Sequence, residues 1–419
     1  MLEGWPALPL LILWSLWVGQ ALLCAVLVGY VHSRLRRPPH EADLAYRPKA
    51  WVIVPFKGDD DDVHAVLEAL LAQNYPRFHL VCVVEDRNDR AYPLIQRSLA
   101  AHPPAQWTLV VAGPAPPYRG QKVHNQLAGL ETIETRCDDP DVYAFVDSDV
   151  VPGTDWLARL VEPLRRRDRA VSTGYRWFFP EPREGEGRVS LWADLASVMN
   201  SSVACLDPYR RTTQAWGGSM ALTVETARAG RLYARWEKAL TDDYPVTQLA
   251  RDLGKQVRYQ PQCLVRSEVS FRAGELFRFA HRQYLITRVY APRIYALALL
   301  FTWGYVLAAV TAWIQLLGGV AGTGSVWQWI LPASALLTVA VTNQVRAILR
   351  AKCARLAFGH EAVKQLRRAL LLDRWATTAW MALHGVLMLQ PLFTRVVRWR
   401  GIRYRLSAPD RVERLAIER

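Results

Sequence analysis

Two carboxylates separated by one residue are the strongest candidates for chemistry in this sequence. They form the tripeptide Asp147-Ser148-Asp149 and follow an apolar run at 142–146. If the strand predicted for that run continues, Asp147 and Asp149 point to the same side, because side chains alternate along a strand. A pair of this kind suits a hard cation such as Mg²⁺ or Mn²⁺, which takes its other ligands from phosphates and water. The alternative is a solvated turn, since Asp is common where strands end.

Two earlier strands are also expected to end in polar residues. The first stops at 55–58 (PFKG), before an acidic run at 59–62 that could cap the next helix, and the second stops at 85–89 (EDRND). The carboxyl ends of parallel strands form the ligand-binding edge of an open α/β sheet. Carboxylates gathered there repel one another unless a cation lies between them, so a divalent metal is implied.

Other candidate site residues lie in loops between the predicted strands. Lys122 could lie near a diphosphate at a helix N-terminus, or in an ordinary exposed loop. Trp216 and Gly217 form a turn that would let a sugar approach the backbone, as any tight turn might require. Asp242 and Asp243 precede a helix, and one of them could cap it, which leaves the other as a candidate general base.

The elements that must position these residues alternate between strand and helix from about 50 to 271. Strands are predicted at 51–54, 80–84, 107–111, 142–146 and 171–175, and helices at 63–73, 91–101, 122–133, 155–167 and 190–205. This alternation predicts an α/β domain with a mostly parallel sheet and right-handed crossovers. The helix at 190–205 is less polar than a surface helix, so it could lie on a membrane, line an acceptor groove or be core.

Composition indicates a membrane protein with anionic ligands. The 419 residues are 51% hydrophobic with a net charge of +14, and no charged residue occurs in 8–31, 294–345 or 375–394. A helical span needs about 20 such residues. The basic residues flank these segments instead of covering one face, which favours anionic lipid over nucleic acid. The six cysteines have no C-x-x-C spacing, in keeping with a reducing cytoplasm.

Charge bias predicts the orientation of the chain. Arg34, Arg36 and Arg37 follow the first apolar segment, which places the N-terminus outside and the following domain in the cytoplasm. The spans at 292–317 and 326–345 return the chain to the cytoplasm. A further crossing by 375–394 would put a basic tail outside, so this segment is predicted to be re-entrant or in-plane, broken near Pro391.

The motifs together resemble inverting, family-2-like glycosyltransferases of the ceramide glucosyltransferase group, including bacterial members that act on hopanoid lipids. The resemblance covers nearly the full chain and rests on the order of five stretches. They are VVED at 83–86, QKVHN at 121–125, DSD at 147–149, DDY at 242–244 and WRGIRYRL at 399–406. The family's (Gln/Arg)-x-x-Arg-Trp motif falls at 279–283, where Phe279 and Gln283 replace the expected residues and Arg282 matches. Tyr284 could supply the missing ring.

The resemblance implies a role for each candidate. Asp243 would be the catalytic base and Arg282 would offset charge on the leaving group. The predicted ligands of the nucleotide sugar are Pro55, Lys57, Asp86, Lys122 and Asp147. Those of a Mg²⁺ or Mn²⁺ ion are Asp147 and Asp149. Those of the acceptor are Trp216, Gly217, Asp242, Gln283 and Tyr284.

The resemblance also implies an overall organisation and function. The expected parts are an anchor at 1–37, a cytoplasmic GT-A domain at 48–273, an interfacial helix at 274–291, a membrane region at 292–394 and a basic cytoplasmic tail at 395–419. The implied enzyme is a multi-pass protein of a bacterial inner membrane that transfers one sugar from a nucleotide sugar, such as a UDP-sugar, to a lipid hydroxyl with inversion. The alternatives are a processive polysaccharide synthase and a catalytically silent scaffold. Nucleotide release with and without divalent metal would separate either enzyme from the scaffold.

Overall fold

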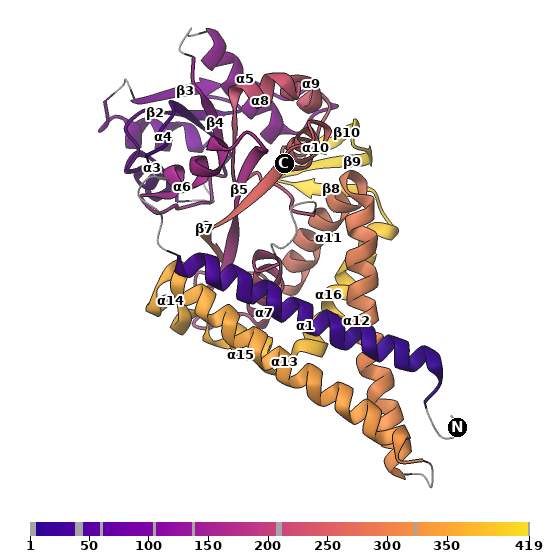
Figure 1. Ribbon diagram of the computed structural model, residues 1–419. Coiled ribbons are helices and arrows are strands. Elements are labelled where there is room, and N and C mark those ends of the chain that lie inside the picture. The colour runs from indigo at the N-terminus through magenta and orange to yellow at the C-terminus, as the bar shows by residue number, and fades with distance from the viewer. Residues whose placement is uncertain are drawn as a thin grey trace.

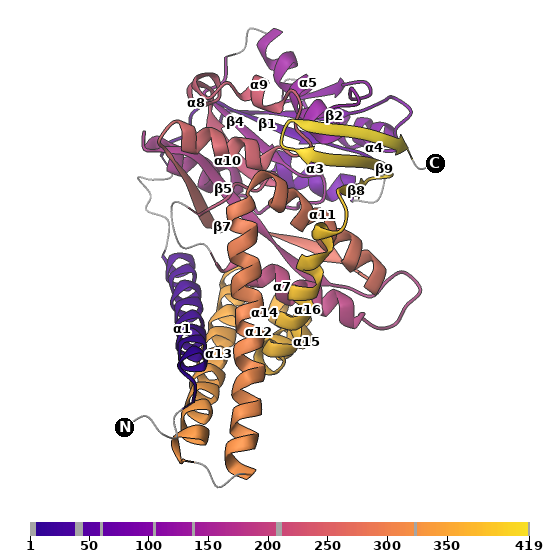
Figure 2. The same ribbon diagram turned by 90° about the vertical axis from the view of Figure 1, so that its right-hand side faces the viewer.

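The computed structural model describes residues 6–37, 45–58, 62–103, 106–135, 139–206, 212–321 and 325–417. An α/β domain lies at one end of the molecule and a bundle of long helices at the other (Figure 1). A small C-terminal sheet lies against the α/β domain (Figure 2). Cys137 and Asp59 to Asp61 of the acidic run lie outside the described residues, so their predicted roles are not addressed.

The α/β domain is built on a seven-stranded sheet of order β3-β2-β1-β4-β6-β5-β7. Strands β3, β2, β1 and β4 are parallel, and β6 is antiparallel to both neighbours. The mostly parallel α/β fold predicted from the alternation is therefore confirmed. The strands are β1 (Ala50–Pro55), β2 (Phe78–Val84), β3 (Trp107–Val111), β4 (Val142–Val146), β5 (Arg169–Pro180), β6 (Ser219–Thr223) and β7 (Gln256–Val269).

Helices cover both faces of this sheet because its buried strands are apolar on both sides. In β1, Val52 and Val54 face one core, while Trp51 and Ile53 face the other. Asp62 caps α3 by accepting a hydrogen bond from Ala65 N at 3.0 Å, as the acidic run predicted. The helices on the first face are α3 (Val63–Leu71), α4 (Ala91–Leu99) and α6 (Trp156–Val161); those on the second are α5 (Gln121–Thr135), α8 (Val224–Ala229), α9 (Leu232–Trp236) and α10 (Asp243–Asp252).

The helix bundle consists of α1 (Leu8–Arg36), α12 (Pro292–Ala321) and α13 (Trp327–Phe358), which run side by side in Figures 1 and 2. In the part of the chain that the structure describes, two helices are long and apolar enough to cross a membrane, Leu8–Arg36 and Pro292–Val320. The span expected at 326–345 is helical, but polar residues such as Gln328 and Asn343 leave α13 less apolar than those two.

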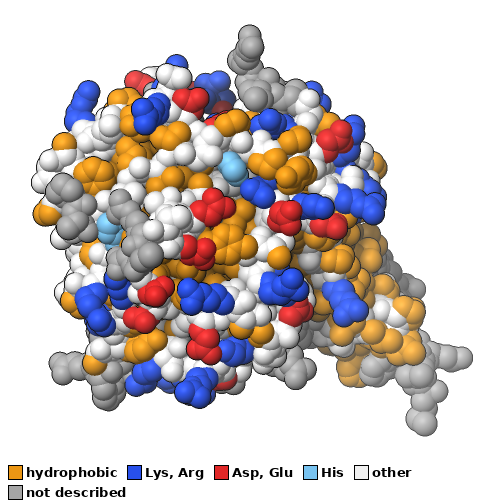
Figure 3. Space-filling model, turned by 90° about the horizontal axis from the view of Figure 1, so that it is seen from above, with side chains coloured by type: hydrophobic (Ala, Val, Ile, Leu, Met, Phe, Trp, Pro, Cys, Tyr) orange, Lys and Arg blue, Asp and Glu red, His pale blue; other side chains and the backbone are white. Residues whose placement is uncertain are grey.

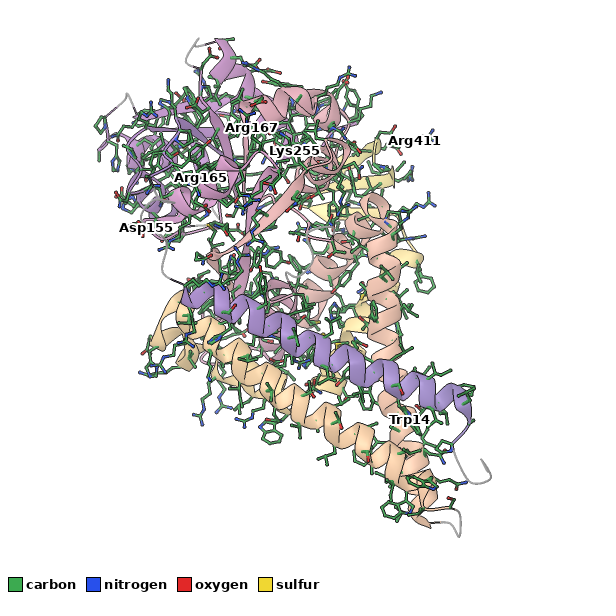
Figure 4. The ribbon with its side chains drawn as sticks, viewed as in Figure 1. Trp14, Asp155, Arg165, Arg167, Lys255 and Arg411 are labelled. Atoms are coloured by element: carbon green, nitrogen blue, oxygen red, sulfur yellow. The ribbon has the colours of Figure 1, made fainter. Side chains whose placement is uncertain are left out.

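The bundle and the α/β domain differ in surface character. Figure 4 places Trp14 in the bundle, where its indole N–H donates to Thr311 Oγ1 at 3.2 Å, and places Asp155, Arg165, Arg167 and Lys255 in the α/β domain. Seen from above, the α/β domain carries side chains of both charges, whereas apolar side chains dominate the visible part of the bundle behind it (Figure 3). The bundle is thus the part suited to lipid.

Shorter helices connect the bundle to the α/β domain. They are α7 (Leu191–Ala204), α11 (Ala273–Tyr290), α14 (His360–Gln365), α15 (Arg367–Trp375) and α16 (Thr377–Leu389). The 13 residues of α16 span about 20 Å, less than the roughly 30 Å of a bilayer core. A 3₁₀ turn containing Pro391 ends this segment. The break predicted near Pro391 is therefore confirmed.

The C-terminal residues form structure instead of the expected basic tail. They make a three-stranded antiparallel sheet of β8 (Val396–Trp399), β9 (Ile402–Ala408) and β10 (Arg411–Ile417). Alternate residues Ile402, Tyr404 and Leu406 are buried against α11 residues Leu285 and Ile286. The period-2 apolar pattern outweighs the charges in this segment, because the arginines occupy the opposite face of the strands.

The end of α1 is fastened directly to the α/β domain. The Arg34 guanidinium donates from Nη1 to Tyr259 O at 2.7 Å and from Nη2 to the Gln260 side chain at 2.5 Å, both on β7. Gln262 of the same strand donates to Arg34 O at 2.8 Å. The α/β domain therefore adjoins the basic end of α1.

Candidate active site

A pocket opens at the carboxyl ends of β1 and β4, the edge at which parallel α/β sheets bind ligands. Three parts of the protein meet there: the α/β domain, helix α11 and the C-terminal sheet. The lining residues that matter below are Pro55, Lys57, Lys122, Asp147, Asp149, Arg176, Trp216, Gly217, Asp242, Asp243, Arg282, Gln283, Trp399, Arg400 and Tyr404.

The carboxylate pair lies in a turn and not on the strand. Strand β4 ends at Val146, and residues 147–149 turn away from the sheet. The shared strand face predicted for Asp147 and Asp149 is therefore wrong, although both still line the pocket. Their side chains are 22% and 38% exposed. The turn brings the two carboxylates to the pocket by a different geometry from the one predicted.

Lys122 connects the carboxylates of two chain segments. Its ammonium lies 2.6 Å from Asp147 Oδ1 and 3.0 Å from Asp242 Oδ2, at the start of α5. Burial opposes the charge on Lys122, but Asp147 and Asp242 raise the pKa of the ammonium above its usual value. Lys122 in turn holds the pKa of Asp147 below its usual value, although burial acts the other way. Both groups are therefore charged at neutral pH.

The donor set at this turn fits a divalent cation. Asp147 and Asp149 supply carboxylate oxygens, and Mg²⁺ or Mn²⁺ typically takes one or two of these and completes its shell with phosphate and water. Among the described residues, no group of three or more His, Cys, Asp or Glu side chains is placed to hold a metal by itself. A cation held at Asp147 and Asp149 would accordingly depend on ligands from the substrate.

Asp242 is a buried anchor of the pocket wall. Its side chain is 2% exposed and accepts hydrogen bonds from Gln126 Nε2 at 2.8 Å and from Lys122 Nζ. It precedes α10 without capping that helix through its side chain. Asp242 thus lines the pocket, but its carboxylate is already bound by Gln126 and Lys122.

Asp243 is the first residue of α10, and its carboxylate has different partners from that of Asp242. Its Oδ1 accepts hydrogen bonds from Thr241 Oγ1 and from Tyr244 N, each at 2.8 Å. Burial, followed by the charge of Asp242, raises the pKa of the Asp243 carboxyl to about 6. A carboxylate with a pKa near neutrality in a pocket is suited to general base chemistry.

Arginines and aromatic rings alternate across the pocket. The Arg282 guanidinium lies 5.1 Å from the ring centre of Trp399 and 5.5 Å from that of Phe279. The Arg176 guanidinium lies 5.3 Å from the ring centre of Phe279 and 5.5 Å from that of Trp216. Burial, together with repulsion from Arg176 and Arg400, lowers the pKa of Arg282 to about 10. The site thus concentrates positive charge beside Asp147 and Asp149.

Two predicted site residues are not part of the pocket lining. Asp86 is exposed in the turn after β2 and accepts from Asn88 N at 2.8 Å, while Glu85 pairs with Lys57 at 2.6 Å. The Tyr284 ring lies 5.6 Å from the His384 ring. The rings near the Arg282 guanidinium are those of Phe279 and Trp399.

The pocket lining includes residues to which the sequence analysis gave no site role, among them Arg176, Trp399, Arg400 and Tyr404. Arg176 directly follows the strand predicted at 171–175, whereas β5 continues to Pro180 and carries Arg176 to the pocket. The other three lie in the segment that was expected to be a tail, and an alternation of apolar and basic residues there could have indicated strands.

The Asp242 carboxylate packs against the backbone of Gly217, and we expect Gly217→Ala to disrupt this contact. A Cβ at this position would lie 2.3 Å from Asp242 Oδ2. Displacing that carboxylate would disturb Lys122 and lower transfer activity strongly, with a loss of about 1–3 kcal/mol in stability from overpacking. Activity and thermal unfolding measure the two effects. Gly153→Ala is the matched control, because nothing lies within 4 Å of its Cβ position. Equal behaviour of the two variants would contradict this account.

Comparison with known proteins places the chain in a family. The mannosyltransferase PcManGT from Pyrobaculum calidifontis, solved with GDP-Man and Mn²⁺, is 16% identical, with 91% of this chain and 97% of that chain covered and a TM-score of 0.48. Glucosyl-3-phosphoglycerate synthase from Mycobacterium tuberculosis, solved with Mn²⁺ and UDP-glucose, is also 16% identical, with 60% and 84% covered and a TM-score of 0.36. The model of glycosyl transferase family 21 matches residues 16–412, and the chain belongs to this family of nucleotide-sugar glycosyltransferases.

Proposed function

We propose that this glycosyltransferase transfers one sugar from a UDP-sugar to a hydroxyl of a membrane lipid, with inversion and with the help of Mg²⁺ or Mn²⁺. The observation that carries the proposal is the single pocket that holds Asp147, Asp149 and Asp243. The first two residues suit the metal and diphosphate of a donor. Asp243, with its pKa near 6, suits the proton of an acceptor.

The protein residues have distinct roles in this reaction. Asp243 accepts the proton of the lipid hydroxyl, and the Thr241 hydroxyl holds the carboxylate in place. Arg282 and Lys122 offset negative charge on the departing nucleoside diphosphate. A bound Mg²⁺ or Mn²⁺ at Asp147 and Asp149 would supply further charge neutralisation to the leaving group. Attack from the side opposite the nucleotide is one displacement, so an α-linked donor gives a β-glycoside.

The surroundings of the pocket support a lipid acceptor. Phe279 packs with Phe178 and Phe271, and this apolar cluster continues to α7 and α16. It therefore joins the pocket-lining helix α11 to α7 and α16, and α16 packs against α12 of the helix bundle. Leu191 and Val203 of α7 are exposed, as expected for a surface that contacts lipid. Each buried CH₂ of a lipid tail contributes about 0.8 kcal/mol, so tails can supply most of the anchoring.

The pH dependence follows from Asp243. We expect turnover to rise with pH through about 6 and then level off, because the carboxylate must be unprotonated to act as a base. Thr241→Val removes a hydrogen bond that lowers the pKa of Asp243, so the acidic limb should move to higher pH. Rates from pH 5 to 8 measure this shift. Thr135→Val is the control, because the exposed Thr135 hydroxyl donates only to Thr132 O at 3.0 Å, at the end of α5. An unmoved limb in Thr241→Val would contradict the base assignment.

The proposed orientation places the α/β domain in the cytoplasm of a bacterial cell, at the basic end of α1. The C-terminal sheet packs on that domain, so Ser407 should lie on the same side. A cysteine at Ser407 should resist an impermeant thiol reagent in intact spheroplasts and react after lysis. Cys24 and Cys137 are replaced by Ser for this test; the remaining cysteines are buried. A cysteine at Glu3 is the control expected to react. Reaction of Ser407→Cys in intact spheroplasts would reverse the orientation.

The function is tested with purified protein, UDP-glucose, UDP-galactose or GDP-mannose, and lipid extracts containing ceramide or diacylglycerol. We expect lipid-dependent release of UDP, loss of release in EDTA, and one sugar per lipid of β configuration. A ladder of oligosaccharides formed from donor alone would replace this proposal with a processive synthase. Absence of nucleotide release under every condition would favour a silent scaffold.

A further inference from the structure

The tip of the β8–β9 hairpin enters the pocket from the C-terminal end of the chain. The two residues Trp399 and Arg400 lie at this tip and line the pocket, although 250 residues separate them from Asp149 in the sequence. Arg400 and Gly401 have positive φ angles of 47° and 75°, as in the two-residue turns that favour Asn-Gly. An arginine at this position is costly for the backbone, so its side chain warrants a functional explanation.

Several contacts fasten the hairpin across the front of the pocket. Arg400 Nη1 donates to Lys57 O at 3.1 Å, in the loop after β1. The Tyr404 hydroxyl accepts from Gln121 N at 3.4 Å, at the first residue of α5. Arg414 N donates to Pro117 O at 2.7 Å. The hairpin is thereby held over the ends of β1 and α5, the elements that face a nucleotide in this kind of sheet.

The charges around Arg400 suit an anion. Lys57, Lys122, Arg176 and Arg282 line the same pocket as the carboxylates Asp147, Asp149, Asp242 and Asp243. Repulsion from Arg176 and Arg400 acts on the half-buried Arg282. Arg176 pairs with Asp149 at 3.7 Å, so the carboxylates offset part of this positive charge, and an entering phosphate would offset more of it. A planar guanidinium can donate two parallel hydrogen bonds to phosphate oxygens.

Trp399 has a separate part in the same arrangement. Its ring lies under the Arg282 guanidinium at 5.1 Å, and Gln283 occupies the position at which the family motif has Trp. A ring face stabilises a guanidinium and fixes its plane. The hairpin thus adds a second ring beside Arg282, in addition to Phe279 of α11.

We propose that the β8–β9 hairpin is part of the donor site, in which Arg400 binds the diphosphate of the nucleotide sugar and Trp399 positions Arg282. This inference rests on the proposed function, because it assigns more of the same pocket. If the hairpin holds the diphosphate, donor binding requires the C-terminal sheet.

The diphosphate contact is tested with Arg400→Asn, because Asn tolerates the left-handed backbone and removes the charge. Binding of UDP, GDP, UMP and GMP is measured by calorimetry on the full chain in detergent with Mn²⁺. We expect Arg400→Asn to weaken binding of the preferred diphosphate by about 10- to 100-fold and that of its monophosphate much less. Arg400→Lys should recover part of the loss.

Arg405→Ala is the matched control for the loss of charge. Arg405 lies on β9, is exposed and pairs with Glu413 at 2.8 Å, on the face opposite Tyr404. Its removal should leave diphosphate binding unchanged. Thermal unfolding of all variants checks that the sheet is intact. If Arg400→Asn and Arg405→Ala bind the diphosphate as the wild type does, the contact is refuted while the proposed function stands. If the wild-type protein binds neither diphosphate and releases none, the proposed function itself fails.

The positioning role is tested by the separation of kcat from KM. Trp399→Leu should lower kcat by about 10-fold or more while changing donor KM little, because the ring acts on Arg282 and not on the donor directly. Trp399→Phe should restore most of kcat, since it keeps a ring face. Equal loss in the Leu and Phe variants, or a change confined to thermal stability, would show that Trp399 only packs.

Discussion

Asp147→Asn and Asp149→Asn are each expected to abolish sugar transfer in a protein that remains folded. Each change removes the charge of a proposed metal ligand that lines the pocket, while the volume of the side chain stays nearly the same. A metal at a phosphoryl leaving group contributes several kcal/mol, so turnover should fall by about 10³-fold or more. In the Asp147 variant, Lys122 keeps its pair with Asp242 at 3.0 Å, which limits the structural damage. Turnover and thermal unfolding, measured together, separate chemistry from folding.

Asp155→Asn provides the matched control for these variants. Asp155 follows the same turn, is 44% exposed and pairs with Arg159 at 3.6 Å outside the pocket. Its replacement should change turnover little, since an exposed ion pair contributes about 0–1 kcal/mol. Wild-type turnover of both pocket variants would exclude the metal assignment, as would full turnover in the presence of EDTA.

The sequence predicted the part of the site that depends on the parallel sheet. Pro55, Lys57, Lys122, Asp147 and Asp243 follow strands or begin helices, and all line one pocket. The reason is topological: strand ends of a parallel sheet meet at one edge, whatever the loops between them do. The local geometry of Asp147 and Asp149 was predicted wrongly, because a turn and a strand can present the same two residues to a ligand.

The C-terminal part of the site could not be placed by the same reasoning. Residues 396–406 contain four arginines, and that density concealed the apolar positions Val397, Ile402, Tyr404 and Leu406. Contact between this segment and Asp147 depends on long-range packing against α11, for which local sequence holds no signal. Tyr284 was considered as a substitute for the aromatic residue of the motif at 279–283, and the structure additionally brings the distant Trp399 to 5.1 Å from the Arg282 guanidinium.

Glu85 and Asp86 are adjacent acidic residues with different contacts in the structure. Both Glu85 and Asp86 follow β2, and the resemblance selected Asp86. In the structure Glu85 pairs with the pocket residue Lys57, while Asp86 accepts from the backbone of its own turn and is exposed. Asp86 therefore stays a proposed nucleoside ligand that would contact the donor at the rim of the site. Comparing Asp86→Asn with Glu85→Gln in uridine binding would assign this role.

Asp243→Asn is expected to fail in a different way from the metal-site variants. The substitution retains the hydrogen bond from Tyr244 N but removes the group that accepts the proton of the acceptor. Loss of a positioned general base costs about 10²–10⁴-fold in rate. Donor binding should remain close to wild type, because Lys122, Arg282 and the carboxylates at 147 and 149 are unchanged.

The comparison of kcat with donor affinity decides the role of Asp243. Calorimetry with UDP and Mn²⁺ should give nearly the same affinity for Asp243→Asn and wild type, while kcat falls by at least about 10². Asp252→Asn, at the other end of α10, is the control: Asp252 is 46% exposed and pairs with Arg235 at 2.7 Å. Replacing a buried carboxyl whose pKa is raised to about 6 removes an unfavourable charge above that pH, so Asp243→Asn should not lose stability at pH 7.5. A variant that keeps wild-type turnover would show that Asp243 is not the general base. A variant that loses donor affinity instead would show that Asp243 belongs to the nucleotide site.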